Sequence, residues 1–448
     1  MPDNNKLDLK GVCAFIWQLE KVNELLALKR LGAPCWPMVR MRVFYSLAVC
    51  MNLYKNPHPF KRGVVWILKY MAGVVINTGI NFVKINKLLS AEILIFEHPR
   101  TKKHKGQLID IYSYYYANEQ LKERPGNKVL IMSRTLNGWI EKNDSITRFN
   151  IDAIELGRVG LGVLFSRILP FRITCSHLSQ LPVSQKPDSR CLKKIEPLLK
   201  RGWVEYIFTF TAYRFLFYFA RKASELVLID GYSSRAGLIA AAKKAGMKVV
   251  EIQHGVIGKY HIGYSYPISF NLNYLPDELL VWSDSWKREI ESVWPGKIEL
   301  FPNYYLLDQI EKYKNKYSRV ENSIVVISQG TISQQLSQLI LKNINHLGEY
   351  KIHYKLHPSE LASWKNNSTL RKLNRYESVS IVESDELFAL FAQCEYQLGV
   401  YSTALFEGRE FGCKTILANL PGVEYMKNYK PDYWFDDFIG IIENKHQL

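Results

Sequence analysis

Short apolar runs alternate with helical segments over most of this 448-residue chain. Each run has the length of a β-strand, is rich in Val, Ile and Leu, and ends in a polar or glycine-containing turn. Such runs are typical of parallel strands that helices cover on both faces, because neither face then needs polar residues. The sequence therefore predicts an α/β fold with parallel sheets.

The predicted strands fall into two series. The first comprises residues 92–97, 128–132, 225–229, 248–252, 278–282 and 297–301, and the second 323–327, 351–356, 379–382, 397–400 and 414–417. Helical segments of roughly ten to fifteen residues separate the strands of the second series, as right-handed crossovers require. We predict two α/β domains: 1–310, with a helical extension over about 1–88, and 311–448, whose last helix packs back on the N-terminal domain.

The charge of the chain points to an anionic partner. Lys and Arg number 59 against 42 Asp and Glu, which gives a formal net charge of +17, and 13% of the residues are aromatic. A nucleic acid, a membrane surface or a phosphorylated small molecule would suit that surplus. However, the basic residues are spread along the chain and form no recognised nucleic-acid-binding motif, so we predict no nucleic-acid partner.

Cysteine usage and the N-terminus favour a cytoplasmic protein. The seven cysteines are scattered without a C-x-x-C pair, as is typical of reduced thiols, and no signal-peptide pattern is present. Two apolar windows, 63–85 and 206–220, contain basic residues and are poor transmembrane helices. Either window could lie on a membrane surface or be a buried helix.

Two strand ends of the second domain carry residues suited to a phosphate. Ligands of open parallel sheets bind beyond the carboxyl ends of the strands, where helices begin. The first strand is followed by Gln329, Gly330 and Thr331, in which the glycine allows a tight turn and the threonine can cap a helix. The second is followed by His357 and Pro358, and this imidazole can donate a hydrogen bond to a phosphate or act as an acid. A helix cap and a histidine satisfied by the backbone are the structural alternatives.

A third strand end of the same domain adds hydroxyl groups. Ser402 and Thr403 begin a predicted helix, where side chains and backbone N–H groups can bind a phosphate together. Glu407, one turn further on, could reach a ribose diol. An ordinary N-cap would explain one hydroxyl but not the whole group.

The first domain offers two candidates for a general base. Asp230 follows one predicted strand and His254 follows the next, and either could accept a proton from a hydroxyl group. Gly255 lets the backbone approach a ligand closely, and Tyr260 and His261 follow it on what we predict to be the acceptor side. An aspartate at a strand end is often only a helix cap.

These motifs together resemble the GT-B-fold glycosyltransferases of bacterial surface-polysaccharide biosynthesis. The segment 355–358 looks like the HisPro motif of bacterial sialyltransferases and capsular Kdo transferases, and Ser402-Thr403 resembles their Ser/Thr motif. Ile229-Asp230-Gly231 is similar to the acidic-acidic-Gly motif of sialyltransferases but has Ile229 where an acid is expected. The same order of motifs also looks like that of CDP-glycerol teichoic-acid polymerases. The resemblance covers roughly residues 225 to 420.

The resemblance implies two Rossmann-like domains that face a cleft, and a role for each candidate. His357, Ser402 and Thr403 would bind the donor's phosphate, Glu407 or Glu410 would touch the ribose, and Asp230 or His254 would deprotonate the acceptor.

The implied reaction is an inverting transfer from a nucleotide sugar, with a CMP-linked acidic sugar favoured, to a lipid-linked or glycan acceptor. The protein would act in capsule, O-antigen or lipopolysaccharide biosynthesis, at the inner face of the cell membrane. No Asp-x-Asp motif stands at a strand end, so neither a metal nor another cofactor is expected. A polyol-phosphate transferase and a sugar-nucleotide epimerase on the same scaffold remain alternatives.

Overall fold

The structure, a computed structural model, describes most of the chain. The described residues are 8–54, 63–98, 101–104, 107–124, 126, 128–134, 147–170, 192–232, 234–266, 273–384, 386–426 and 429–445. The chain divides into two compact units. Unit 1 contains Gly11–Leu47 and Pro59–Asn303, and unit 2 contains Lys6–Lys10, Ala48–His58 and Tyr304–Leu448. The main division thus falls at 303–304, a few residues before the predicted boundary, and two short N-terminal pieces belong with unit 2.

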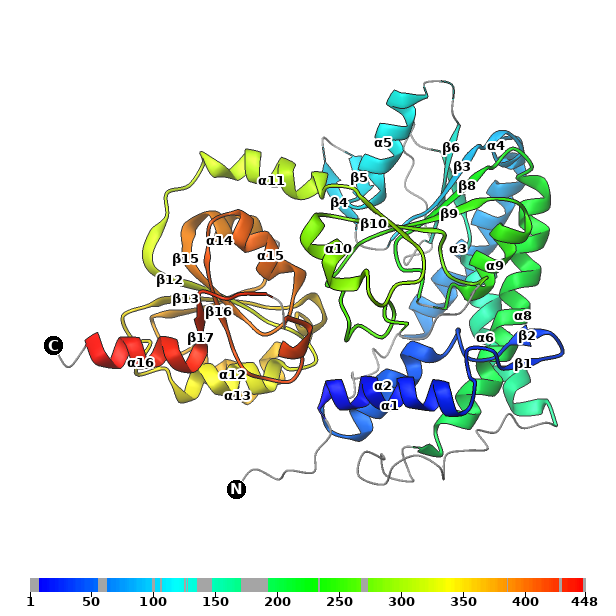
Figure 1. Cartoon of the computed structure of the whole chain (residues 1–448). Helices are drawn as coiled ribbons and strands as arrows, with labels where there is room; N and C mark the ends of the chain where they lie inside the picture. Colours follow the sequence, from blue (N-terminus) through cyan, green and yellow to red (C-terminus); the bar gives the residue numbers. More distant parts are fainter. Residues whose placement is uncertain are drawn as a thin grey trace. The chain divides into compact units, whose positions relative to one another are not determined.

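Unit 1 is built on a parallel sheet of seven strands in the order β11-β10-β9-β8-β3-β6-β7 (Figure 1). Its strands are β3 (Ile93–Phe96), β6 (Val129–Ser133), β7 (Arg148–Asn150), β8 (Glu225–Leu228), β9 (Lys248–Ile252), β10 (Glu278–Val281) and β11 (Lys297–Leu300). Two small antiparallel pairs stand outside this sheet: β1 (Lys29–Arg30) with β2 (Ala33–Pro34), and β4 (Thr101–His104) with β5 (Gln107–Asp110).

The helices of unit 1 precede the sheet or connect its strands. They are α1 (Leu9–Val22), α2 (Arg40–Cys50), α3 (Val64–Val83), α4 (Ile85–Ser90), α5 (Ser113–Glu123), α6 (Asp152–Ile168), α8 (Ile195–Phe219), α9 (Ala236–Lys244) and α10 (Asp284–Ile290). The first residues of α1 and the last of α2 belong to unit 2. Tyr213 and Phe217 of α8 and Leu238 of α9 pack on the buried strands to form the core of the unit.

Unit 2 is built on a parallel sheet of six strands in the order β14-β13-β12-β15-β16-β17. Its strands are β12 (Val320–Ile327), β13 (Lys351–Lys355), β14 (Val379–Val382), β15 (Cys394–Gly399), β16 (Lys414–Leu417) and β17 (Tyr433–Trp434). Its helices are α11 (Tyr304–Lys314), α12 (Ser333–Lys342), α13 (Ser368–Leu373), α14 (Leu387–Gln393), α15 (Thr403–Glu410) and α16 (Phe435–Lys445), with short 3-10 helices at Pro358–Glu360, Trp364–Asn366 and Val423–Met426. In Figure 1, α12, α13 and α16 lie on one face of this sheet, and α14 and α15 lie on the other.

The strand order reverses once in each sheet. In unit 1 the chain builds outward from β3 through β6 and β7, then returns to the other side of β3 with β8. In unit 2 the reversal lies between β12 and β15. This is the Rossmann-type order, and its reversal point is where ligands of open α/β sheets bind. The predicted α/β class with two parallel sheets is confirmed; the cleft between them stays a prediction.

The last helix packs within its own unit. Phe435, Phe438, Ile439 and Ile442 of α16 are buried in the core of unit 2, beside strand residues such as Ile416. Contact of this helix with the N-terminal domain stays a prediction.

The two apolar windows have different environments. The window at 206–220 lies in α8, which buries Tyr213 and Phe217 over the sheet. The window at 63–85 is mostly α3, and only 22% of the most apolar part of α3 is buried. By length and composition alone, α3 is the one helix among the described residues that could cross a membrane.

Candidate functional site

The predicted phosphate-binding residues of unit 2 lie at the carboxyl ends of three adjacent strands. Gln329 to Thr331 follow β12, His357 follows β13, and Ser402 follows β15. A side chain at Gly330 would collide with Ser359, so the first two segments are in close contact. Gln329 donates a side-chain hydrogen bond to the carbonyl of Tyr401, and this contact bridges the reversal point between β12 and β15.

His357 is held in a defined orientation by the turn that it begins. It precedes the short helix Pro358–Glu360, and its Nδ1 accepts a hydrogen bond from the backbone N–H of Ser359 at 3.2 Å. The backbone N–H of His357 donates to Glu360 Oε2 at 2.8 Å. Because Nδ1 accepts, the proton of a neutral ring belongs on Nε2. That N–H is suited to donate to a phosphate oxygen.

Ser402 caps a helix, which agrees both with an ordinary N-cap and with a phosphate-binding residue at a helix start. Its hydroxyl oxygen accepts a hydrogen bond from the N–H of Ala404 at 3.2 Å, and α15 begins at Thr403. The N-terminus of α15 carries a partial positive charge that favours an anion. Glu407 is buried within α15 at 7% exposure. Its predicted contact with a ribose is not tested by this geometry.

Asp230 follows β8 next to the reversal point of unit 1. Its side chain is 28% exposed and forms an ion pair with Arg235, with Oδ1 and Nε 3.5 Å apart. This ion pair fixes the orientation of the carboxylate, and a carboxylate at a strand end can accept a proton from a hydroxyl group.

His254 follows β9, the neighbouring strand, and is surrounded by aromatic rings. Its Nε2 lies 3.3 Å from the hydroxyl of Tyr232, and its Nδ1 lies 3.5 Å from the hydroxyl of Tyr264. The ring of His98, at the end of β3, lies 5.4 Å from that of His254 between centroids. The structure therefore brings the strand ends of β3, β8 and β9 into one cluster.

Glu251 lies beneath this cluster and is fully buried. It accepts hydrogen bonds from the N–H of Gly231 at 2.9 Å and from the hydroxyl of Tyr264 at 2.8 Å. Burial raises the pKa of this carboxyl to about 8, and the charge of Asp230 acts in the same direction. Glu251 is thus protonated at neutral pH. Its hydrogen bonds hold Gly231, next to Asp230, and Tyr264, next to His254, in place.

The three predicted acceptor-side residues are placed differently from one another. Tyr260 stacks on Trp17, and the backbone oxygen of Gly255 accepts a hydrogen bond from the side chain of Gln253 at 2.9 Å. His261 lies against the rings of Tyr232 and Tyr264, and desolvation there lowers its pKa. Its ring packs edge-on against Tyr232, and its role on the acceptor side stays a prediction.

Sequence reasoning missed several residues of both sites. His98 follows a predicted strand, so the rule that found His254 would have found it as well. Tyr401 stands directly before the predicted Ser402 and was not singled out. Glu251 is an acid inside a predicted strand, and a buried acid has no pattern in the sequence that distinguishes it from an exposed one.

Cysteines and metal ligands complete the inventory of reactive groups. Among the residues that the structure describes, no group of three or more His, Cys, Asp or Glu side chains is placed to hold a metal ion. Cys13, Cys35, Cys394 and Cys413 are buried free thiols. Cys50 is disulfide-bonded, so the expectation that every cysteine is reduced is wrong there. Cys175 and Cys191 lie outside the described residues.

The chain is similar to known proteins in its backbone fold alone. No protein family and no curated protein match the sequence. The UDP-GlcNAc 2-epimerase from Methanocaldococcus jannaschii has a TM-score of 0.44 and 10% identity, over 80% of this chain and 92% of that one. A UDP-forming α,α-trehalose-phosphate synthase from Burkholderia xenovorans has a TM-score of 0.40 and 10% identity, over 80% and 92%. The pneumococcal O-GlcNAc transferase GtfA has a TM-score of 0.32 and 14% identity, over 49% of this chain and 48% of that one. At these values the likeness does not extend to substrate or activity.

The raised pKa of Glu251 predicts a specific dependence of stability on pH. The folded protein holds this proton up to about pH 8, whereas the unfolded chain releases it near pH 4.5. The free energy of unfolding should therefore fall as pH rises through this window, by up to about 1.4 kcal/mol per pH unit, and then level off. Glu251→Gln should remove that slope while it keeps an oxygen acceptor. Urea unfolding at pH 5, 6.5 and 8 measures it.

The exposed Glu299 provides the control. Its pKa is lowered by its contacts with Lys297, so Glu299→Gln should leave the slope between pH 5 and 8 unchanged. Parallel stability curves for the wild type and Glu251→Gln would show that Glu251 is ionised in the folded protein.

Proposed function

We propose that this protein is a glycosyltransferase that moves a sugar from a nucleotide-sugar donor to an acceptor hydroxyl group. The observation that carries the proposal is the meeting of Gln329–Thr331, His357 and Ser402 at the reversal point of unit 2. These segments offer N–H and O–H donors, an imidazole and a helix N-terminus, which are the groups that bind a diphosphate. Unit 1 supplies candidate bases at its own reversal point.

The chemistry on the donor side is stabilisation of the leaving phosphate. Negative charge develops on the phosphate oxygens as the sugar departs, and the Nε2–H of His357 and the N-terminus of α15 can stabilise that charge. Thr331 lies within hydrogen-bond distance of the Tyr401 hydroxyl, so both groups border the same space. Glu407 would then hold the ribose.

The chemistry on the acceptor side is removal of a proton. Asp230 is ion-paired and partly exposed, and His254 is held between two tyrosine hydroxyls, so each has a defined orientation. The acceptor oxygen would attack the anomeric carbon in one displacement, and the configuration would invert. The proposal requires both units to reach the same sugar during turnover.

The donor, the acceptor and the pathway that we propose rest on the resemblance of the motifs to those of known glycosyltransferases. A CMP-linked acidic sugar is the favoured donor, transferred without a metal to a lipid-linked or glycan acceptor of capsule, O-antigen or lipopolysaccharide biosynthesis. A CDP-glycerol-type transferase shares the same motifs. An epimerase would convert the donor alone into an isomer, so product analysis without acceptor separates it from a transferase.

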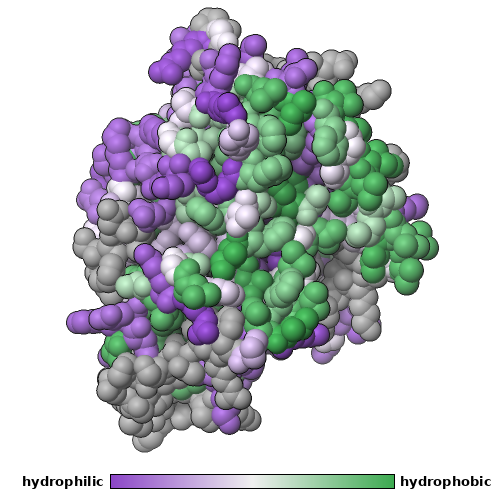
Figure 2. Space-filling model, turned by 90° about the vertical axis from the view of Figure 1, so that its right-hand side faces the viewer, coloured by the Kyte–Doolittle hydropathy of each residue, from purple (hydrophilic) through white to green (hydrophobic). Residues whose placement is uncertain are grey.

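We further propose that unit 1 associates peripherally with the inner face of the cell membrane. The exposed apolar side chains of α3 are Val64, Val65, Ile67, Leu68, Met71, Val75, Ile76, Ile80, Phe82 and Val83. Its other side makes polar contacts with the unit, since Asn81 and Asn150 exchange hydrogen bonds and Tyr70 contacts Asp152. A helix so attached favours lying in the membrane interface, and the net charge of +17 suits anionic lipids. Figure 2 shows a broad hydrophobic area on one side of the molecule.

Loss of the His357 imidazole should weaken nucleotide binding. A thermal-shift screen across CMP, CDP, UDP and GDP identifies the nucleotide, and His357→Ala should then need about tenfold more of it for the same shift. The melting temperature without nucleotide should stay close to that of the wild type. His346→Ala, an exposed histidine of the same unit, is the control. An unchanged shift in His357→Ala would remove this residue from the site, and preference for GDP would overturn the CMP assignment.

Asp230→Asn and His254→Asn should separate the two candidate bases. The true base should lose a factor of roughly 10² to 10⁴ in kcat while the donor KM is kept. The pH profile of the variant that retains activity gives the second readout, since a carboxylate base becomes active at lower pH than an imidazole base. Near-full activity of both variants would place the base elsewhere.

Membrane recovery should depend on the apolar face of α3. Leu68→Ser with Val75→Ser removes two exposed side chains and creates no cavity, so the fold should persist while sedimentation with anionic vesicles falls several-fold. Val320→Ser, at an exposed position of unit 2, is the control. High salt should also reduce recovery. Resistance of the wild type to alkaline extraction would mean that α3 crosses the membrane.

A further inference from the structure

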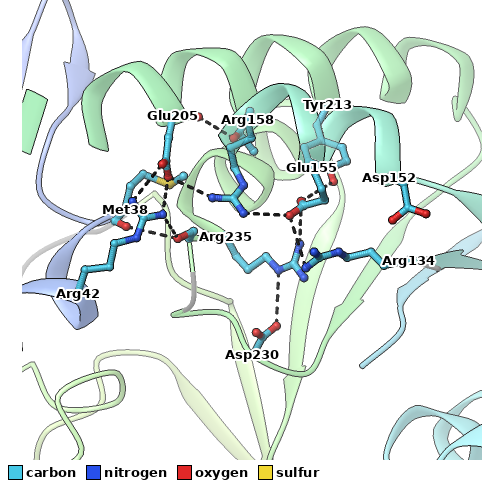
Figure 3. Close-up of polar contacts among 12 residues, drawn as sticks. Met38, Arg42, Arg134, Asp152, Glu155, Arg158, Glu205, Tyr213, Asp230 and Arg235 are labelled. Carbon is cyan, nitrogen blue, oxygen red and sulfur yellow. Dashed lines mark hydrogen bonds and ion pairs between the residues drawn. The ribbon is translucent and has the colours of Figure 1, made fainter. Parts of the chain in front are cut away.

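Unit 1 contains a cluster of five arginines around two buried glutamates. Figure 3 shows Arg42, Arg134, Arg158 and Arg235 gathered about Glu155 and Glu205, and the fifth member is Arg201. Neither the sequence motifs nor the proposed roles of Asp230 and His254 account for this arginine cluster.

Each glutamate contacts three of the arginines. Glu205 lies 3.1 Å from Arg158 and 2.7 Å from Arg201, and it also accepts from both terminal nitrogens of Arg42. Glu155 lies 3.1 Å from Arg158, 3.2 Å from Arg235 and 3.7 Å from Arg134. Arg158 therefore joins the two halves of the arginine cluster.

The electrostatics of the cluster leave positive charge uncompensated. Burial opposes ionisation of Glu155, but the nearby arginines outweigh it and hold its pKa below the usual value. Asp230 and the buried Asp152 lie beside the two glutamates, so the cluster has four carboxylates. Among the described residues, these four carboxylates are outnumbered by the five guanidinium groups. The Nε atoms of Arg134 and Arg158 are buried without a hydrogen-bond partner among those residues, and the Nε of Arg235 has its 3.5 Å ion pair with Asp230.

The cluster lies at the edge of the sheet where a substrate would bind. Arg134 follows β6, and Asp230 and Arg235 follow β8, while β3 lies between these two strands. The arginine side chains at 42, 134 and 201 are 28%, 34% and 31% exposed, so a ligand can reach them. Tyr70 joins α3 to this edge through Asp152, which is the acid at the start of α6.

We propose that the arginine cluster binds a phosphate or pyrophosphate group of the acceptor, beside Asp230. Guanidinium groups bind phosphate oxygens through paired N–H donors and stay charged at any physiological pH. The identification of the ligand as an acceptor rests on the proposed function, whereas the assignment of an anion site does not depend on it. The apolar face of α3 on the same unit favours a lipid-borne anion over a soluble one.

Calorimetric titration of the full chain with inorganic pyrophosphate at physiological salt tests the site. Arg134→Gln is the informative variant, since its 3.7 Å contact with Glu155 is the longest in the cluster and its loss should leave the fold intact. We expect about tenfold weaker binding, with Arg134→Lys intermediate because it keeps the charge without the paired donors. Arg221→Gln, an exposed arginine that precedes β8 at the other edge of the sheet, should bind like the wild type.

Binding that is absent in the wild type, or equal in Arg134→Gln and Arg221→Gln, would overturn the inference. Pyrophosphate could also occupy the site in unit 2, and His357→Ala separates the two. If the inference holds, His357→Ala keeps pyrophosphate binding and Arg134→Gln keeps the nucleotide-induced thermal shift. Loss of pyrophosphate binding in His357→Ala would place the ion in unit 2 and overturn the inference.

Farnesyl pyrophosphate distinguishes the source of the anion. Tighter binding of this ligand than of inorganic pyrophosphate, reduced to the inorganic value by Leu68→Ser with Val75→Ser, supports a lipid-linked acceptor. Equal binding of the two ligands would overturn the lipid assignment and leave a soluble phosphate as the ligand.

Discussion

Parallel strand pairing is the constraint on which both sites depend. A parallel strand cannot be joined to its neighbour by a tight turn, so a helix must carry the chain back across the sheet. All carboxyl ends then meet at one edge, and helices begin there. At the reversal of strand order the two adjacent helices go to opposite faces, which leaves room for a ligand. Asp230 in unit 1 and Ser402 in unit 2 both stand at such a reversal.

The two edges differ in the kind of charge they carry. Unit 2 offers N–H and O–H donors, above all His357 and the start of α15, which in the proposed function bind the departing phosphate. Unit 1 offers buried carboxylates and guanidinium groups in one network, with Glu251 beneath Asp230 and the arginine cluster beside it. Charges held away from water act strongly on one another, so small changes there should alter both pH dependence and affinity.

Most of the sheet could be predicted, and the exceptions have clear causes. The strands at 248–252, 379–382 and 414–417 have the predicted bounds, because their apolar runs are bounded by polar turns. β7 and β17 are only three and two residues long, too short for a pattern to show. The same rule of strand ends located Asp230, His254, His357 and Ser402, and it would have located His98. Arg134 and Glu205 come from segments far apart in the chain, and no spacing links them.

The sequence by itself determined the class of fold and the strand ends, because apolar runs and the turns after them are local patterns. It also determined that phosphate-binding residue types stand at the ends of the predicted strands in the second series. Only the tertiary structure decided the order of strands, and with it which ends are neighbours. It also decided that α3 exposes its apolar face while α8 buries part of its own, and that five arginines meet two glutamates. Burial and charge pairing depend on contacts between distant segments, and such contacts leave no periodic mark on a single chain.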